Sequence, residues 1–207
     1  MPDLFSHSHR ETINIPILDG ELLLVKGFYG LEEANKLQQE LTNGLDWQAK
    51  AIKIFGKEIM QPRLMAWYGE PDAVYTYSGT TFAPNAFTAS LLQIKTDIES
   101  FTQSKFNSVL ANLYRNGQDS MGWHSDDEPE LGSNPIIASL SLGEERVFKL
   151  RHRKDKTLKM DVPLPHGSLL VMSGAMQHHW QHALPKSAKV MSPRINLTFR
   201  QVSAVQQ

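Results

Sequence analysis

The sequence contains no cysteine. This absence excludes disulfide bonds, thiolate metal sites, iron–sulfur clusters and cysteine nucleophiles, so any metal must be held by histidine or carboxylate side chains. No apolar run is long enough to span a membrane, and the first residues lack the basic and apolar regions of a signal peptide. The formal net charge of −1 provides no global attraction to nucleic acid. We expect a soluble protein without membrane contact, located in the cytoplasm, or in the nucleus of a eukaryotic host.

What is present is typical of one globular domain over residues 1–207. The chain is 41% apolar and 21% charged, as expected of a protein with a single core. A short buried strand is expected over 22–25, and apolar residues at helical spacing predict helices over 31–45 and roughly 86–103. Residues 47–77 carry β-branched and aromatic residues between turn residues, which predicts short strands with a hairpin at Phe55-Gly56.

Beyond Asn107 the sequence predicts strands separated by short turns. The segments are 108–114, 121–126, 136–142, 146–151, 157–162, 168–172, 179–183 and 194–200. Closely spaced strands of this kind favour a two-sheet sandwich of the jelly-roll type, with the early helices covering one sheet, in an α+β fold. The densest basic run, Lys149–Lys156 followed by Lys159, is either a solvated hairpin tip or a patch that contacts phosphates.

One pair of residues suggests a metal site. His124 and Asp126 are two apart in a predicted strand, and the period of two places both side chains on one face. A histidine from another strand would complete a site of two histidines and one carboxylate, which leaves open positions on iron(II) for a co-substrate and oxygen. Because a histidine and an aspartate two residues apart are common by chance, this pair needs support from elsewhere in the chain.

The last predicted strand provides that support. Its apolar residues alternate with polar residues that include Arg194 and Arg200. Two arginines on an inward face need anionic partners, and guanidinium groups pair with carboxylates. The strand is roughly 20 Å long, which leaves room between the two arginine side chains for a five-carbon dicarboxylate. Asn112 and Tyr114 share one face of another strand and offer amide and phenol donors. The alternative is an exposed edge strand with surface salt bridges.

These motifs together resemble the AlkB family of iron(II)- and 2-oxoglutarate-dependent nucleic-acid dealkylases. The segments that carry the resemblance are Asn112–Tyr114, His124–Glu128, Trp180–Pro185 and Pro193–Arg200, with weaker similarity from about residue 50. It implies a double-stranded β-helix core over about 107–201, a nucleotide-recognition lid over about 47–80 and an N-terminal extension over about 1–20. The implied iron ligands are His124, Asp126 and His182. The implied 2-oxoglutarate pocket consists of Asn112, Tyr114, Arg194, Asn196 and Arg200, with Arg194 at the distal carboxylate and Arg200 near the iron.

Three histidines crowd the position of the third ligand, at residues 178, 179 and 182. The family pattern selects His182, so we expect His178 and His179 to lie beside the site or on the surface. His166 resembles the residue of a turn before a strand in the family and is assigned no chemistry. Three further histidines are expected to be exposed: His7, His9 and His152.

The expected substrate-binding residues are Phe55, Arg63, Tyr75, Tyr77 and Glu128. Enzymes that modify a base in a duplex extrude it and hold it between flat side chains. Tyr75 and Tyr77 resemble the family's pocket-lining positions, and the alternative is that they are ordinary strand aromatics. Glu128 would accept a hydrogen bond from an exocyclic amine and favour a cationic methylated base. The segment containing Phe55 and Arg63 resembles the finger hairpin of duplex-preferring members, in which Phe55 fills the gap left by the flipped base. The alternative is a phenylalanine folded onto the core.

The resulting expectation is a monomeric oxidative demethylase of alkylated DNA, with RNA as an alternative nucleic-acid substrate. It would use Fe(II), 2-oxoglutarate and O₂ on bases such as 1-methyladenine and 3-methylcytosine, and release formaldehyde, succinate and carbon dioxide. One alternative is an oxygenase with the same core that acts on RNA, protein or a small molecule. Another is a module that binds damaged nucleic acid without catalysis, although such a module has no need of complete ligand and arginine sets.

Overall fold

The computed structural model describes residues 10–54, 57–73, 75–77, 80–82 and 84–203. Its elements, in chain order, are β1 (Glu11–Asn14), β2 (Glu21–Lys26), α1 (Leu31–Gly44), β3 (Gln48–Ile54), β4 (Lys57–Gly69), β5 (Tyr75–Tyr77), β6 (Thr80–Phe82), α2 (Ala89–Thr102), β7 (Ser108–Tyr114), β8 (Met121–His124), the 3-10 turn Pro129–Leu131, β9 (Ile137–Gly143), β10 (Arg146–His152), β11 (Lys159–Leu164), β12 (Ser168–Ser173), α3 (Met176–His179), β13 (Trp180–Leu184) and β14 (Arg194–Arg200). No helix in these ranges is long and apolar enough to cross a membrane.

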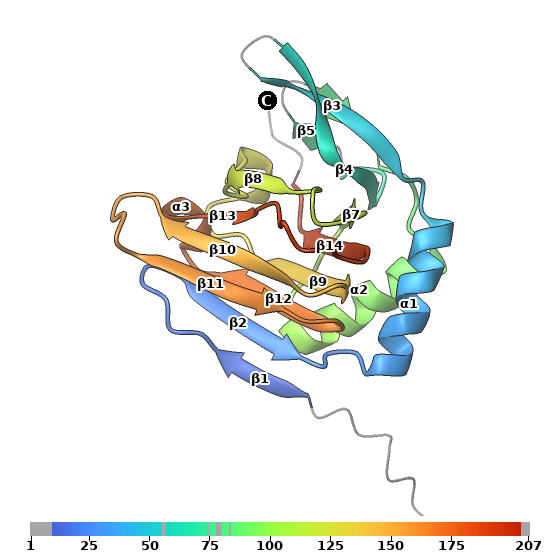
Figure 1. The fold of residues 1–207 in the computed structure, drawn as a ribbon, viewed down its shortest axis with the longest axis horizontal. Coiled ribbons are helices and arrows are strands. Elements are labelled where there is room, and N and C mark those ends of the chain that lie inside the picture. Colours follow the sequence, from blue (N-terminus) through green and yellow to red (C-terminus); the bar gives the residue numbers. More distant parts are fainter. Residues whose placement is uncertain (1–9, 55–56, 74, 78–79, 83, 204–207) are drawn as a thin grey trace, which may run out of the picture.

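The strands form two packed sheets. Among the described residues, the larger sheet has eight strands in the order β1-β2-β12-β9-β14-β7-β4-β3, and the smaller has four in the order β11-β10-β13-β8. The strands β5 and β6 form a separate pair. The helices α1 and α2 contact each other, and α1 packs on β9, so they cover the larger sheet (Figure 1). This arrangement confirms the predicted jelly-roll core with the early helices over one sheet.

Alternation along the central strands divides the apolar core into two layers. Ile195, Leu197 and Phe199 of β14 are fully buried in the layer that contains the buried faces of α1 and α2. The other face of β14 points between the two sheets, and every residue of the strand is buried. Because β14 lies between β9 and β7, the alternative of an exposed edge strand is wrong. The two arginines of this strand therefore face the interior.

The two long helices begin and end close to their predicted bounds. Ala34, Leu37 and Leu41 form the buried face of α1. The hydroxyl of Thr88 accepts a hydrogen bond from the backbone N–H of Leu91 and caps the N-terminus of α2. Because this cap places Thr88 outside the helix, α2 begins three residues later than predicted.

The segments around the core differ from the expectation in detail. The strand β1 lies within the expected N-terminal extension and pairs with β2 at the edge of the larger sheet. The strand β4 is part of both the finger hairpin with β3 and the larger sheet, where it pairs with β7. The predicted strand over 179–183 begins one residue late because the short helix α3 ends at His179.

Candidate active site

Two histidines and an aspartate meet at the interior face of the smaller sheet. His124 in β8 and His182 in β13 are direct partners across the two strands, so their side chains lie on the same face. Their Nε2 atoms are 3.0 Å apart. Oδ2 of Asp126, two residues after His124, is 3.7 Å from Nε2 of His182. One ligand atom from each of the three residues lies within 4.8 Å of the others, so the three can share one metal ion.

The protonation states of both imidazoles suit a metal. Nδ1 of His124 lies 2.9 Å from the carbonyl oxygen of Gly122. A carbonyl only accepts, so Nδ1 donates, and in the neutral form of the ring Nε2 is the nitrogen with the lone pair that a metal needs. Burial and the neighbouring imidazole of His124 lower the pKa of His182 to about 3, against the opposing effect of Asp126. Neutral imidazoles and a carboxylate are the donor set that holds iron(II) in centres of two histidines and one carboxylate, so the residues fit this ion.

Asp126 is held as a buried anion by Arg200 at the end of β14. A guanidinium Nη2 of Arg200 donates to Oδ1 of Asp126 at 2.6 Å, and the two side chains are 6% and 5% exposed. Burial alone would raise the pKa of Asp126, but the charge and hydrogen bond of Arg200, together with the neighbouring imidazoles of His182 and His124, lower it to about 2. Oδ1 is therefore occupied by Arg200, and Oδ2 remains available beside the histidines.

At the opposite end of β14, Arg194 is a buried cation with an unused donor. It is 2% exposed, and Nη2 donates to the hydroxyl of Ser141 at 2.9 Å. Its Nε atom is buried and has no hydrogen-bond partner among the described residues. Burial lowers the pKa of Arg194 to about 10, so the group remains charged at neutral pH. A buried guanidinium with a free N–H is suited to bind the carboxylate of a ligand.

The residues predicted for the dicarboxylate pocket lie on one buried face. Arg194 pairs with Tyr114 across β14 and β7, and Asn196 pairs with Asn112. Asn196 is anchored by a hydrogen bond from its Nδ2 to Ser139 at 2.8 Å. A dicarboxylate bound by these residues would therefore lie along β14 between Arg194 and Arg200, and Arg200 also binds Asp126, a predicted metal ligand. A dicarboxylate with one end at the metal and the other at Arg194 matches this arrangement.

Comparison with known proteins agrees with this geometry. Residues 21–200 match the family model described as the 2OG-Fe(II) oxygenase superfamily. The chain belongs to this superfamily. It is 46% identical over 188 residues to alpha-ketoglutarate-dependent dioxygenase alkB homolog 3 of Bos taurus, covering 86% of this chain and 65% of the relative. It is 38% identical to the DNA oxidative demethylase ALKBH2 of Homo sapiens, covering 84% and 70%. These relatives confirm the resemblance to the AlkB family.

The fold of this 2OG-Fe(II) oxygenase also matches a solved structure described as that of OsALKBH1. The TM-score is 0.64 at 17% identity, over 90% of this chain and 99% of the other, which supports the shared fold alone. The chain spans just under two thirds of the length of the alkB homolog 3 proteins that it matches. The superfamily name implies iron(II) and 2-oxoglutarate, as predicted from the sequence.

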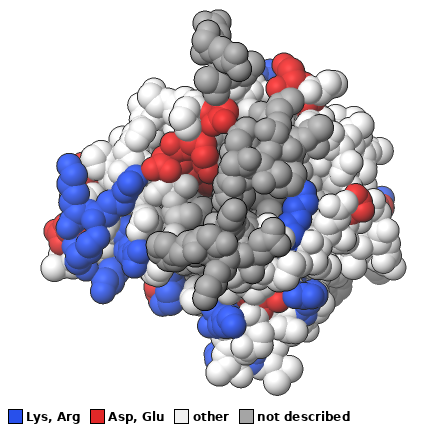
Figure 2. All heavy atoms as spheres, turned by 90° about the horizontal axis from the view of Figure 1, so that it is seen from above, with Lys and Arg blue, Asp and Glu red and all other residues white. Residues whose placement is uncertain are grey.

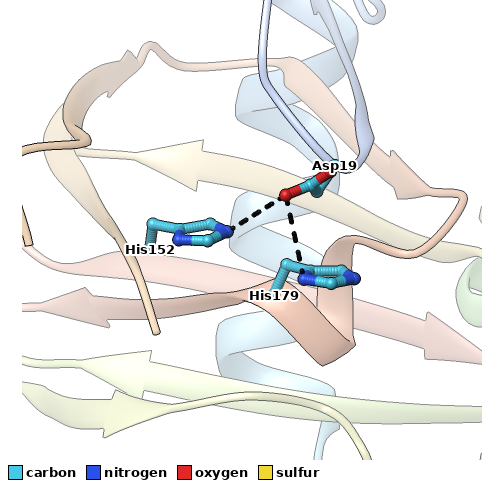
Figure 3. A group of neighbouring side chains, drawn as sticks. All are labelled: Asp19, His152 and His179. Atoms are coloured by element: carbon cyan, nitrogen blue, oxygen red, sulfur yellow. Dashed lines mark ion pairs between the residues drawn. The ribbon is translucent and has the colours of Figure 1, made fainter. Parts of the chain in front are cut away.

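A second cluster of two histidines and an aspartate corrects the expectation for His152. This residue is 4% exposed, not on the surface, and its Nε2 lies 3.3 Å from Oδ2 of Asp19 (Figure 3). Nδ1 of His179 is 3.9 Å from the same oxygen, and the two rings are nearly parallel. The backbone N–H of Asp155 donates to Nδ1 of His152, so Nε2 carries the proton of the neutral ring. Binding a metal through Nε2 would require this proton to move to Nδ1 and the hydrogen bond from Asp155 to break. The contacts of the cluster link the turn before β2 to the ends of β10 and α3.

The residues predicted for substrate binding are only partly described. Phe55 lies outside the described residues, and Tyr75 and Tyr77 lie on β5. Oε2 of Glu128, just after the metal ligands, is buried without a hydrogen-bond partner in the described part of the chain. Arg63 is 3% exposed, and its Nε donates to Oδ1 of Asn112 at 2.7 Å. This contact places Arg63 beside the dicarboxylate pocket.

The sequence reasoning missed the small polar residues that support the arginine face. Ser139 and Ser141 lie in β9 beside β14, and each contacts a side chain of the pocket. Their signal was present as two serines that alternate with leucines in an otherwise apolar strand. Such a pattern indicates a second polar face that meets the interior of the sandwich.

Proposed function

We propose that this chain oxidatively demethylates N-alkylated bases in DNA, using iron(II), 2-oxoglutarate and O₂, with RNA as an alternative nucleic-acid substrate. The observation that carries the proposal is the adjacency of the two sites. Arg200 binds Asp126 of the metal cluster and lies on the same strand as Arg194, so a dicarboxylate held along β14 reaches the metal. The similarity to relatives named as an alpha-ketoglutarate-dependent dioxygenase and a DNA oxidative demethylase supports this reaction class.

Iron(II) bound by His124, Asp126 and His182 would supply the oxidation that couples decarboxylation of 2-oxoglutarate to hydroxylation of an N-methyl group, with loss of formaldehyde. The protein positions the reactants. Arg194 and its neighbours orient the distal carboxylate, while Arg200 keeps Asp126 ionised and turns Oδ2 toward the histidines. Because these groups are buried, water is excluded from the co-substrate end of the pocket.

The substrate is proposed to be a cationic methylated base such as 1-methyladenine or 3-methylcytosine. Glu128 has a buried carboxylate oxygen with no hydrogen-bond partner among the described residues, which suits the exocyclic amine and positive charge of such a base. Tyr75 and Tyr77 of β5 would hold the flipped ring. We propose that Phe55 fills the space left in a duplex and that the protein acts as a monomer.

The basic run supports a contact with the nucleic-acid backbone. Figure 2 shows Lys and Arg side chains gathered at the left of the molecule, where Figure 1 places the hairpin between β10 and β11. Lys154 and Lys156 of this hairpin are exposed. Arg153 forms an ion pair at 2.7 Å with Asp127, which directly follows a metal ligand. The hairpin is thus tied to the loop that carries the site, and we propose that its lysines contact phosphates.

Succinate release would test the proposed function. The protein would be incubated with iron(II), ascorbate and 2-oxoglutarate, with no oligonucleotide, an unmodified oligonucleotide, or one that carries 1-methyladenine or 3-methylcytosine. Single- and double-stranded DNA and RNA would be compared. We expect succinate release to rise only with methylated oligonucleotides. Turnover that no oligonucleotide stimulates would contradict a nucleic-acid substrate, and binding of methylated oligonucleotides without any turnover would identify a non-catalytic module.

A further inference from the structure

A fourth buried arginine, after Arg63, Arg194 and Arg200, lies beside the dicarboxylate pocket. Arg146, the first residue of β10, is 3% exposed and lies outside the sequence motifs that predicted the active site. Within the described part of the chain, its guanidinium donates only to backbone carbonyls: to Pro185 at 2.6 Å, Asp119 at 3.1 Å and Asn116 at 3.4 Å. It therefore holds the loop after β7 against the end of β13.

The charge of Arg146 is not paired with a carboxylate within the described residues. The carboxylate of Asp119, whose backbone carbonyl accepts a hydrogen bond from Arg146, is itself bound by Arg115 through two guanidinium hydrogen bonds of 2.8 and 2.9 Å. Burial lowers the pKa of Arg146, whereas the negative charges of Asp119 and Glu144 favour the cation. A fixed positive charge thus lies in the interior, supported mainly by carbonyl dipoles.

Tyr114 joins this charge to the pocket. The guanidinium carbon of Arg146 is 5.9 Å from the centre of the Tyr114 ring, and that of Arg194 is 5.3 Å from the same centre. The aromatic ring is therefore attracted by two guanidinium groups. The two cations also affect each other, because the charge of Arg146 contributes to the lowered pKa of Arg194. Two buried cations around one ring favour an anion at this end of the pocket.

We propose that Arg146 is a positioning residue for the co-substrate: it holds Tyr114 beside Arg194 and adds a second positive charge where the distal carboxylate of 2-oxoglutarate binds. This inference rests on the proposed function, which requires 2-oxoglutarate in the pocket. Arg146 acts through Tyr114 and through its charge, without touching the reacting atoms. It should therefore affect the affinity for a dicarboxylate much more than the affinity for a ligand without the distal carboxylate.

Binding to the protein loaded with Mn²⁺ would test this inference without turnover. Calorimetry would compare 2-oxoglutarate with 2-oxopentanoate, which has the same chain length but no distal carboxylate. Arg146→Met removes the charge, and Arg146→Lys keeps it. Lys149→Met is the matched control, because it removes a cation from the outer face of the same strand, where Lys149 pairs with Asp161. Thermal melting of each variant would confirm that the protein is folded at the temperature of the titration.

We expect Arg146→Met to weaken 2-oxoglutarate binding about tenfold, because it removes one unit charge near a buried anion. Binding of 2-oxopentanoate, which lacks the distal carboxylate, should change by less than about threefold. Arg146→Lys should retain most of the 2-oxoglutarate affinity, and Lys149→Met all of it. Equal weakening of both ligands, or loss of affinity in Arg146→Lys as large as in Arg146→Met, would mean that Arg146 is only structural. If the unaltered protein failed to bind 2-oxoglutarate, the proposed function itself would be wrong.

Discussion

Replacing Arg200 with methionine should destabilise the metal-free protein strongly. The side chains of Arg200 and Asp126 are 6% and 5% exposed and joined at 2.6 Å, so the substitution leaves a carboxylate charge buried without its partner. Breaking a buried pair in this way typically costs about 3–5 kcal/mol. At roughly 2–4 °C per kcal/mol for a chain of this size, the midpoint of thermal unfolding should fall by roughly 6–20 °C. Adding Asp126→Asn to the same chain should recover part of the loss, because it removes the unpaired charge.

Urea unfolding in the presence of a chelator would measure this effect as a double-mutant cycle. We expect a coupling of about 2 kcal/mol or more between positions 126 and 200. The matched control is Arg115→Met, which breaks the ion pair with Asp119 at 2.8 Å where the arginine side chain is 52% exposed, and which should cost about 1 kcal/mol or less. Two results would show that Arg200 does not compensate the buried charge of Asp126. One is a loss of unfolding free energy in Arg200→Met no larger than in Arg115→Met. The other is that the effects of Arg200→Met and Asp126→Asn simply add.

Three further predictions concern other parts of the chain. His182→Ala should abolish iron-dependent turnover, whereas His179→Ala, three residues away, should keep turnover within about threefold; the reverse result would show that the wrong histidine was assigned to the metal. Burial would raise the pKa of Glu99, but hydrogen bonds from the Phe106 N–H and from lysines lower it. Its ionised form therefore stabilises the protein above the ordinary glutamate pKa, and this stability is lost as the pH falls through the lowered value, so Glu99→Gln should flatten the acid limb of stability measured by urea unfolding. Phe55→Ala should reduce activity on a methylated duplex roughly tenfold more than on the same lesion in a single strand, because flipping a base out of a duplex breaks base stacking that Phe55 would compensate. Equal losses on both substrates, together with a large fall in melting temperature, would indicate a core residue.

The sequence predicted β14 and its chemistry well because the signal is local. Three apolar residues alternate with polar ones that include two arginines, and a period of two places each set on one face. The same period predicted that His124 and Asp126 lie together, and they do, but β8 ends at His124, so Asp126 reaches the site from the loop that follows and not from the predicted strand. The choice of His182 over its neighbours came from the family resemblance, because nothing in the local pattern reveals which histidine pairs with β8.

Features that depend on distant residues were missed. His152 lies in a run of charged residues, which suggests exposure, but it is buried against Trp180 and faces Asp19 from a turn over 130 residues earlier. Leu92 fits the apolar spacing of α2 yet is 47% exposed, because the helix buries a narrower face along Leu91, Ile94 and Ile98. Burial at such positions depends on how elements pack together, which the spacing of residues in one element does not determine.

Mass spectrometry of a methylated oligonucleotide tests the central claim most directly. An oligonucleotide with one 1-methyladenine would be incubated with the protein, iron(II), 2-oxoglutarate and oxygen, and the products would be quantified. If the chain is a demethylase, the oligonucleotide loses its methyl group, formaldehyde and succinate form in equal amounts, and His182→Ala yields none of these products. Succinate formation from the active protein while the methylated base stays intact would contradict the claim that this chain is a nucleic-acid demethylase.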